Sequence, residues 1–199
     1  MVVSILHNQS NDLAHPQVDL SSPDFPASSE QERDVTNACA TVPVEVPGVI
    51  GVSANGHSLD KAWYSNYGVG VTQVVAPAGD SFFQGGFLGG VLSTYPVALN
   101  GGGVPYRFLE GISMAGLHCT GVAALIISRF GPMEPGRPQA IINRTADSVA
   151  CPANPFLFPE APRPSGDPQE CQGGNGNNPF YGHGQVNAVE AMQVKDSKE

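Results

Sequence analysis

Residues 111–125, GISMAGLHCTGVAAL, place a serine after a glycine turn and before a run of small and apolar residues. From Ser113 onward, apolar side chains recur at helical spacing as far as Ile127. This pattern predicts a buried helix that ends near Phe130-Gly131-Pro132. A serine at a helix N-terminus lies beside free backbone N–H groups and the positive end of the dipole, which stabilise the anion formed when a hydroxyl attacks a carbonyl. Ser113 is therefore a candidate nucleophile, although serine is also a preferred N-cap in helices without any catalytic role.

Short apolar runs elsewhere in the chain predict the strands of a sheet. Residues 2–6, 49–54 and 71–76 are short and rich in valine and isoleucine, as buried strands are. Two further helices are expected over residues 137–146 and 186–194. Short buried strands with intervening helices indicate an α/β fold with a mainly parallel sheet.

The segments between these elements have the composition of loops. Residues 8–43 are polar and rich in Ser, Pro and Asp, which predicts little regular structure. Residues 85–103 are rich in glycine around one apolar stretch, which is consistent with a hairpin or with surface loops. Residues 195–199 form a polar tail that is expected to fray. One domain is therefore predicted over residues 1–194.

The overall composition excludes some classes of function. Charged residues make up only 14% of the chain and the net charge is -9, whereas a nucleic-acid-binding protein needs a basic surface. No run approaches 18 consecutive apolar residues, so no membrane span is expected. The opening run at residues 1–6 is apolar but lacks a basic leader, so it is interpreted as a buried strand and not as a signal peptide. We expect a fragment or mature piece of an exported protein.

The four cysteines do not suggest a metal site. None of them forms a Cys-x-x-Cys pair, so a zinc site is poorly supported. Cys151 and Cys171 flank a proline-rich excursion, which predicts a disulfide bond in an oxidising compartment, with Cys119 free on the predicted helix. The alternative is four unpaired thiols in a cytosolic protein.

Residues 111–125 resemble the nucleophile motif of subtilisin-like serine proteases (subtilases), Gly-Thr-Ser-Met-Ala-x-Pro-His followed by a helix of small residues. Ile112 replaces the usual Thr and Leu117 the usual Pro. Further segments resemble motifs of this family in the family's order, and the resemblance extends from about residue 1 to about residue 194. These segments are residues 49–54, 64–68, 76–79, 144–146 and 181–188. The inserts at residues 24–47 and 151–171 are most similar to secreted actinobacterial members.

This resemblance implies a three-layer α/β/α domain that is entered after its first third. It implies a secreted serine endopeptidase that hydrolyses polypeptides through an acyl-enzyme on Ser113. By position, Asn8 is the asparagine whose side-chain N–H binds the oxyanion. The alternatives are an ordinary loop asparagine or a glycosylation site, since Asn8-Gln9-Ser10 is also a sequon. No cofactor is implied; structural calcium is possible in such folds, but no Asp-rich loop specifies it.

The base and its carboxylate are expected to lie in a missing N-terminal segment of the same domain. Subtilases carry Asp, His and Ser in that order, so both partners should precede Asn8. His118 lies about 140° round the helix from Ser113 and is interpreted as a structural hydrogen-bonding residue. His183 lies in the closing turn, and the other three histidines lie in loops without a matching motif (His7, His15 and His57). The isolated chain is therefore expected to be inactive.

Two other functions remain open from the sequence. The first is a pseudoprotease or binding module on the same fold, which the changes at Ile112 and Leu117 would suit. The second is an esterase of the α/β-hydrolase type, whose elbow Gly-x-Ser-x-Gly is close to residues 111–115. That fold uses the order Ser, acid, His, and it would bring Asp147 and His183 to Ser113.

Overall fold

A computed structural model describes residues 1–15, 17–19, 29, 31–36, 38–153, 169–174 and 176–195. The predicted polar tail lies outside the described residues apart from Lys195, and so does most of the excursion between Cys151 and Cys171.

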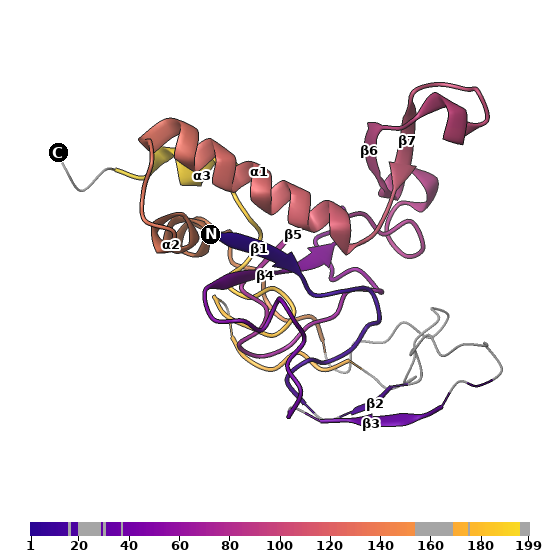
Figure 1. The fold of residues 1–199 in the computed structure, drawn as a ribbon, viewed down its shortest axis with the longest axis horizontal. Helices are drawn as coiled ribbons and strands as arrows, with labels where there is room; N and C mark the ends of the chain where they lie inside the picture. The colour runs from indigo at the N-terminus through magenta and orange to yellow at the C-terminus, as the bar shows by residue number, and fades with distance from the viewer. Residues whose placement is uncertain are drawn as a thin grey trace.

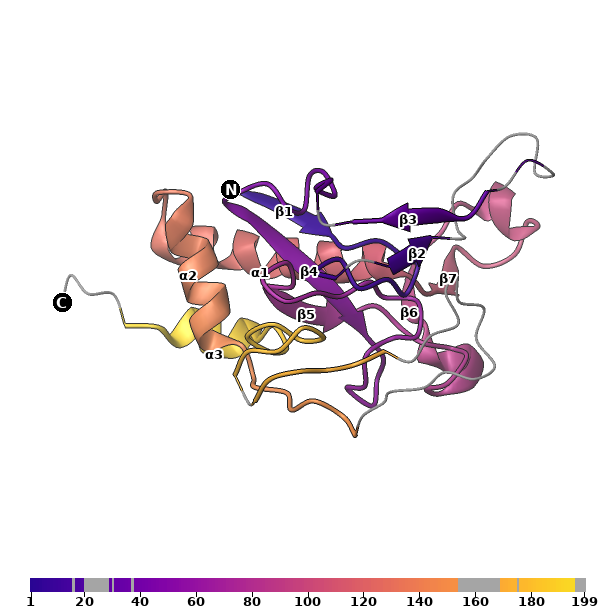
Figure 2. The same ribbon diagram turned by 90° about the horizontal axis from the view of Figure 1, so that it is seen from below.

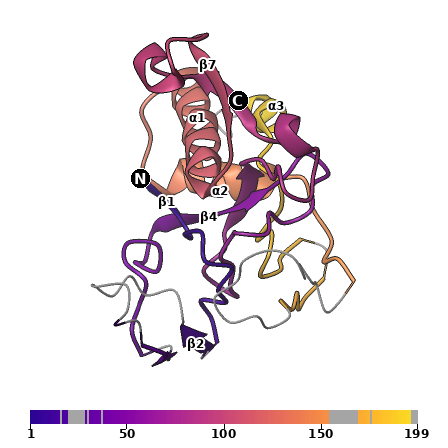
Figure 3. The same ribbon diagram turned by 90° about the vertical axis from the view of Figure 1, so that its right-hand side faces the viewer.

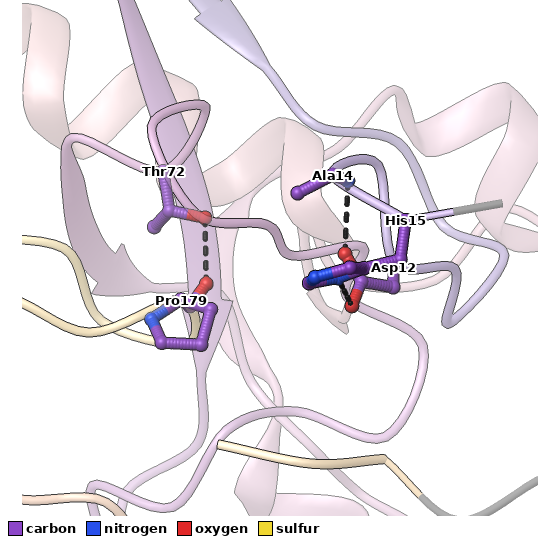
Figure 4. A network of polar contacts seen from close by, with 5 residues as sticks. All are labelled: Asp12, Ala14, His15, Thr72 and Pro179. Atoms are coloured by element: carbon purple, nitrogen blue, oxygen red, sulfur yellow. Dashed lines mark hydrogen bonds and ion pairs between the residues drawn. The ribbon is translucent and has the colours of Figure 1, made fainter. Parts of the chain in front are cut away.

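The centre of the fold is a parallel sheet of three strands in the order β1-β4-β5. These strands are β1 (Val2–Ile5), β4 (Val49–Asn55) and β5 (Val74–Pro77). β4 is the middle strand and is buried almost throughout, because both faces of the sheet are covered. β5 begins later than predicted, because the chain before it turns and the Thr72 hydroxyl donates a hydrogen bond to the carbonyl oxygen of Pro179 at 2.8 Å (Figure 4).

Three helices accompany the sheet: α1 (Ile112–Phe130), α2 (Gly136–Thr145) and α3 (Ala188–Gln193). α1 lies along one face of the sheet, and α2 and α3 lie together near the C-terminal end of α1, towards the end of the sheet where β1 begins (Figures 1 and 2). Loops cover the opposite face, so the second helical layer of the expected three-layer arrangement is not among the described residues. All three helices and the parallel sheet were predicted.

α1 is less buried than its composition predicts. Only one stripe faces the sheet and the other helices; its members include Ala115, Cys119, Val122 and Ile126. On other faces of the helix, Leu117 is 72% exposed and Leu125 is 46% exposed. Within the described residues, α1 is the one helix long and apolar enough to cross a membrane, but it packs on the sheet as the core helix of a folded domain does.

The other face of the sheet carries a second, aromatic core. Tyr67, Val75, Phe180 and Tyr181 pack there together with Cys171, and the rings of Tyr67 and Phe180 meet edge to face at 4.8 Å. The predicted disulfide bond between Cys151 and Cys171 is present beside this core. Cys119 is free and buried and Cys39 is free and exposed.

Two antiparallel strand pairs complete the described fold. The loop predicted over residues 8–43 contains one, formed by β2 (Gln17–Asp19) and β3 (Arg33–Val35), whose short polar sequences gave no strand signal. The other joins β6 (Val91–Thr94) and β7 (Tyr106–Leu109), with the short 3₁₀ helices η2 (Gly86–Gly89) and η3 (Val97–Asn100) beside them. This second hairpin projects past the N-terminal end of α1 (Figures 1 and 3).

Candidate active site

The turn before Ser113 is tied to the carboxyl end of β5. Gly111 has a φ of 140°, a conformation that L side chains rarely adopt. Its N–H lies 3.0 Å from the hydroxyl oxygen of Tyr64 and 3.2 Å from the carbonyl oxygen of Ala78. The Tyr64 hydroxyl in turn donates to the carbonyl oxygen of Gly79 at 2.5 Å. These bonds fix where α1 begins, and with it the position of Ser113.

Two carboxylates lie close to this turn. Burial, together with the negative charges of Glu110 and Asp80, raises the pKa of Tyr64 well above its ordinary value. Its hydroxyl therefore stays protonated and remains a donor. Asp80 is fully buried and accepts the N–H groups of Trp63 and Phe83 at 3.3 and 2.9 Å, which shapes the chain after β5.

The structure places Asn8 against the first turn of α1. Asn8 follows the end of β1, and its Oδ1 accepts the backbone N–H of Ile112, the residue before Ser113, at 2.9 Å. Because an N–H donor requires an oxygen acceptor, this contact fixes the orientation of the amide. The Nδ2 group makes no hydrogen bond within the described residues and is available as a donor. Of the two residues singled out by sequence, Asn8 thus contacts the residue that precedes Ser113, and both Asn8 and Ser113 are exposed.

The loop that carries Asn8 is held by a residue to which the sequence analysis gave no role. Asn66 is almost completely buried, and its Oδ1 accepts the N–H groups of Gln9 at 2.9 Å and Asn11 at 3.0 Å. Its own backbone N–H donates to the carbonyl oxygen of His7. His7 has a φ of 77°, which is strained for a residue with a side chain. The match of residues 64–68 to a family motif was the sequence signal that could have pointed to Asn66.

None of the five histidines, all of which are described, hydrogen-bonds to Ser113, whose hydroxyl has no partner within the described residues. His118 was predicted to be structural, and its Nδ1 lies 2.8 Å from the carbonyl oxygen of Pro77 and 3.0 Å from that of Met114. His15 pairs with Asp12 at 2.8 Å (Figure 4), and His57 lies 3.2 Å from the carbonyl oxygen of Gln84.

The constellation expected for an α/β-hydrolase is not formed. The Asp147 carboxylate accepts two hydrogen bonds from the side-chain amide of Asn187, at 3.0 and 2.9 Å. The backbone N–H of His183 donates to the carbonyl oxygen of Gln73, beside β5. Within the described residues neither Asp147 nor His183 hydrogen-bonds to Ser113, so the Ser, acid, His arrangement of that alternative is absent.

The described residues include no group of three or more His, Cys, Asp or Glu side chains that could hold a metal ion. The structure therefore assigns no ligands to the calcium ion that the resemblance allows.

Comparisons with known proteins give the family and the fold of this chain. The family model described as "Subtilase family" matches residues 10–184. A protein of Deinococcus radiodurans named "Probable subtilase-type serine protease" is 31% identical over 117 residues, which are 53% of this chain and 15% of that protein.

Solved structures share the fold at low sequence identity. A lanthipeptide protease superposes with a TM-score of 0.60 at 20% identity, over 96% of this chain and 50% of its own. The epidermin leader peptide processing serine protease of Staphylococcus aureus gives 0.58 at 19% identity, over 99% of this chain and 41% of its own. The chain spans half or less of each of these relatives, and its fold is subtilisin-like. On the family match over most of its length, this chain belongs to the subtilase family.

Proposed function

We propose that residues 1–194 are the nucleophile-bearing C-terminal portion of a serine endopeptidase catalytic domain. The observation that carries this proposal is the hydrogen bond between Asn8 Oδ1 and the Ile112 N–H at 2.9 Å. It leaves the Nδ2 group of Asn8 free to donate, next to the residue that precedes the exposed Ser113 at the N-terminus of a 19-residue helix. An oxyanion site needs two such converging donors, one from a side chain and one from the nucleophile's own N–H.

The proposed reaction proceeds through an acyl-enzyme. The Ser113 Oγ attacks the carbonyl carbon of a peptide bond while its proton passes to a base. The carbonyl oxygen gains negative charge and accepts hydrogen bonds from Asn8 Nδ2 and the Ser113 N–H. The carbon–nitrogen bond then breaks, the departing amine takes the proton, and water hydrolyses the ester left on Ser113. The substrate is a polypeptide.

We propose that the base and its orienting carboxylate come from an N-terminal segment of the same domain. Two surfaces support this proposal. Among the described residues, β4 is the only strand that pairs with β1, so one edge of β1 has free backbone groups. α1 presents Leu117 and Leu125 to solvent, and a Cβ added at the exposed Gly121 would meet no atom within 4 Å. A further strand on β1 and a helix against α1 would cover both surfaces.

The Cys151–Cys171 disulfide bond, the small share of charged residues and the negative net charge support an extracellular location. A non-catalytic role on the same fold is the second candidate, and the hydroxyl of Ser113, which lacks a base within the described residues, favours it for the isolated chain.

Acylation of Ser113 in the isolated chain tests the proposal. p-Nitrophenyl acetate is supplied together with imidazole as an external base, and the modified peptides are quantified by mass spectrometry. Ser128 is an internal control, because it is exposed on the same helix but lies far along the helix from Asn8. We expect faster acetylation of Ser113 than of Ser128. Equal rates at the two serines would contradict an oxyanion site and favour the non-catalytic role.

A further inference from the structure

The hairpin before Ser113 carries an unusual concentration of exposed apolar side chains. We call residues 81–106 the apolar arm; none of them is charged and none is histidine. Nine of the twenty exposed large hydrophobic side chains of the described residues belong to it, with Phe87 at 75% and Leu88 at 71% exposed. Monomeric proteins rarely expose so many apolar side chains in one region, and such patches mark interaction sites.

Ring contacts and hydrogen bonds define the structure of the apolar arm. The rings of Phe87 and Phe108 meet edge to face at 5.3 Å. The side-chain amide of Asn100 donates to the carbonyl oxygens of Val104 at 2.8 Å and Tyr106 at 3.3 Å, which closes the far end of the hairpin. These contacts shape the hairpin, and the exposed apolar side chains lie on this hairpin.

The base of the apolar arm is joined directly to the candidate nucleophile. β7 ends at Leu109, and only Glu110, Gly111 and Ile112 separate it from Ser113. The Glu110 carboxylate accepts hydrogen bonds from the hydroxyl of Ser81, at 2.7 Å, and from its backbone N–H, so the start of the arm is tied to the residue that follows β7, beside the start of α1. The hairpin therefore lies beside the N-terminal end of α1, where Ser113 is (Figures 1 and 3).

We propose that the apolar arm is a docking surface for an uncharged, apolar stretch of the polypeptide substrate next to the bond that is cleaved. This inference rests on the proposed function, which places a polypeptide at Ser113. Two observations favour an extended peptide. The hairpin that carries these side chains ends at Leu109, close to Ser113 in the sequence, and within the described residues β6 pairs only with β7, so the other edge of β6 can accept a strand. The one charged side chain that β7 adds to the hairpin, Arg107, lies over the ring of Tyr95 at 5.2 Å, and residues 81–106 themselves carry no charge, which favours a partner segment that also lacks charge.

A binding experiment tests this proposal separately from catalysis. The chain carries Ser113→Ala throughout, so a failure of acylation cannot affect the result. The probes are two fluorescently labelled extended peptides, one with Leu and Phe at alternate positions and one with Ser in their places. We expect the apolar peptide to bind at least about tenfold more tightly than its serine counterpart, as burial of one large side chain allows.

Variants locate the binding surface. Leu88→Ser with Leu99→Ser alters two exposed side chains of the apolar arm, and Val69→Ser with Val189→Ser is the matched control, because those two valines are also exposed but lie elsewhere. The arm variant should weaken binding of the apolar peptide about tenfold or more, whereas the control should bind like the parent. Unchanged thermal unfolding of both variants checks that they fold.

Three results would overturn the proposal. The first is equal binding by the arm variant and the control. The second is an arm variant that changes only the association of the chain with itself in sedimentation, which would make a second copy the occupant. The third is an arm variant that changes only binding to phosphatidylcholine vesicles, which would make the arm a lipid-binding device.

Discussion

Asn8→Asp separates the proposed oxyanion role from the structural role of the same side chain. An aspartate keeps an oxygen for the Ile112 N–H, now 2.9 Å from Oδ1. It replaces the Nδ2 donor by a second, negatively charged oxygen. A carboxylate at the start of α1 also interacts favourably with the helix dipole, by about 0.3–1 kcal/mol. The variant should therefore be at least as stable as the parent.

The acylation rate should nevertheless fall steeply. Loss of the corresponding donor in a subtilisin lowers turnover by roughly 10²–10³. Two unit charges about 4 Å apart in water repel each other by about 1 kcal/mol, which is worth roughly a further fivefold. Asn8→Ala is the companion variant: it loses the donor without adding charge, and it also leaves the Ile112 N–H to solvent, at a cost of about 0.5–1.5 kcal/mol.

Acetylation of Ser113 in imidazole and thermal unfolding are measured on the same samples. We expect acetylation to decrease in the order parent, Asn8→Ala, Asn8→Asp, and stability to be lowest for Asn8→Ala. Acetylation of Ser128 should be the same in all three proteins. An Asn8→Asp variant that acylates at the parent rate would refute the oxyanion role, and one less stable than Asn8→Ala would refute the assigned amide orientation.

Further predictions follow from the buried groups. Tyr64→Phe removes the hydroxyl that ties α1 to β5, and it should cost about 1–3 kcal/mol in urea unfolding and slow Ser113 acetylation; an unaffected rate would show that the turn is held without it. Replacing both Cys151 and Cys171 by Ser removes a disulfide bond that spans 20 residues and should lower the free energy of unfolding by about 3 kcal/mol. The contacts of α1 should stay intact. Equal denaturant midpoints for the variant and the parent would contradict this prediction. Burial raises the pKa of the Cys119 thiol to about 12, so at pH 8 a thiol reagent should label exposed Cys39 and reach Cys119 only in denaturant. Because the unfolded chain loses the Cys119 proton at a lower pH than the folded chain does, stability should fall between about pH 9 and pH 12, and Cys119→Ala should reduce that slope in pH-dependent unfolding.

The sheet and the helices could be predicted because their signals are local. β1 and β4 are runs of β-branched residues, and their predicted limits are within one residue of those observed. The exposure of α1 could not be predicted in this way. Helical periodicity shows which side chains share a face, but it cannot show whether a neighbouring element covers that face. Leu117 and Leu125 are apolar, as core residues are, but within the described residues no neighbouring element buries them.

The candidate site was only partly predictable, for a related reason. The positions of Ser113 and Asn8 follow from motifs, but what holds them follows from contacts between distant parts of the sequence. Asn66 binds backbone N–H groups 57 and 55 residues away, and Tyr64 meets Gly111 across 47 residues. The family motif at residues 64–68 contains both residues, but it does not name their partners, because any buried asparagine or tyrosine needs a partner and the sequence does not say which.

The two departures from the nucleophile motif have different consequences, and only the structure separates them. Ile112 is fully buried, so its side chain belongs to the core beneath the turn, while its backbone N–H is used by Asn8. Any residue except proline supplies that N–H, so a change of side chain there acts on packing and leaves the hydrogen bond possible. Leu117 is exposed, and the proline it replaces would lie within α1, where proline removes a backbone hydrogen bond. Leucine therefore restores a backbone N–H donor to the second turn of α1. Its side chain faces outward, so it can act on Ser113 only through an element that packs against this exposed face of α1.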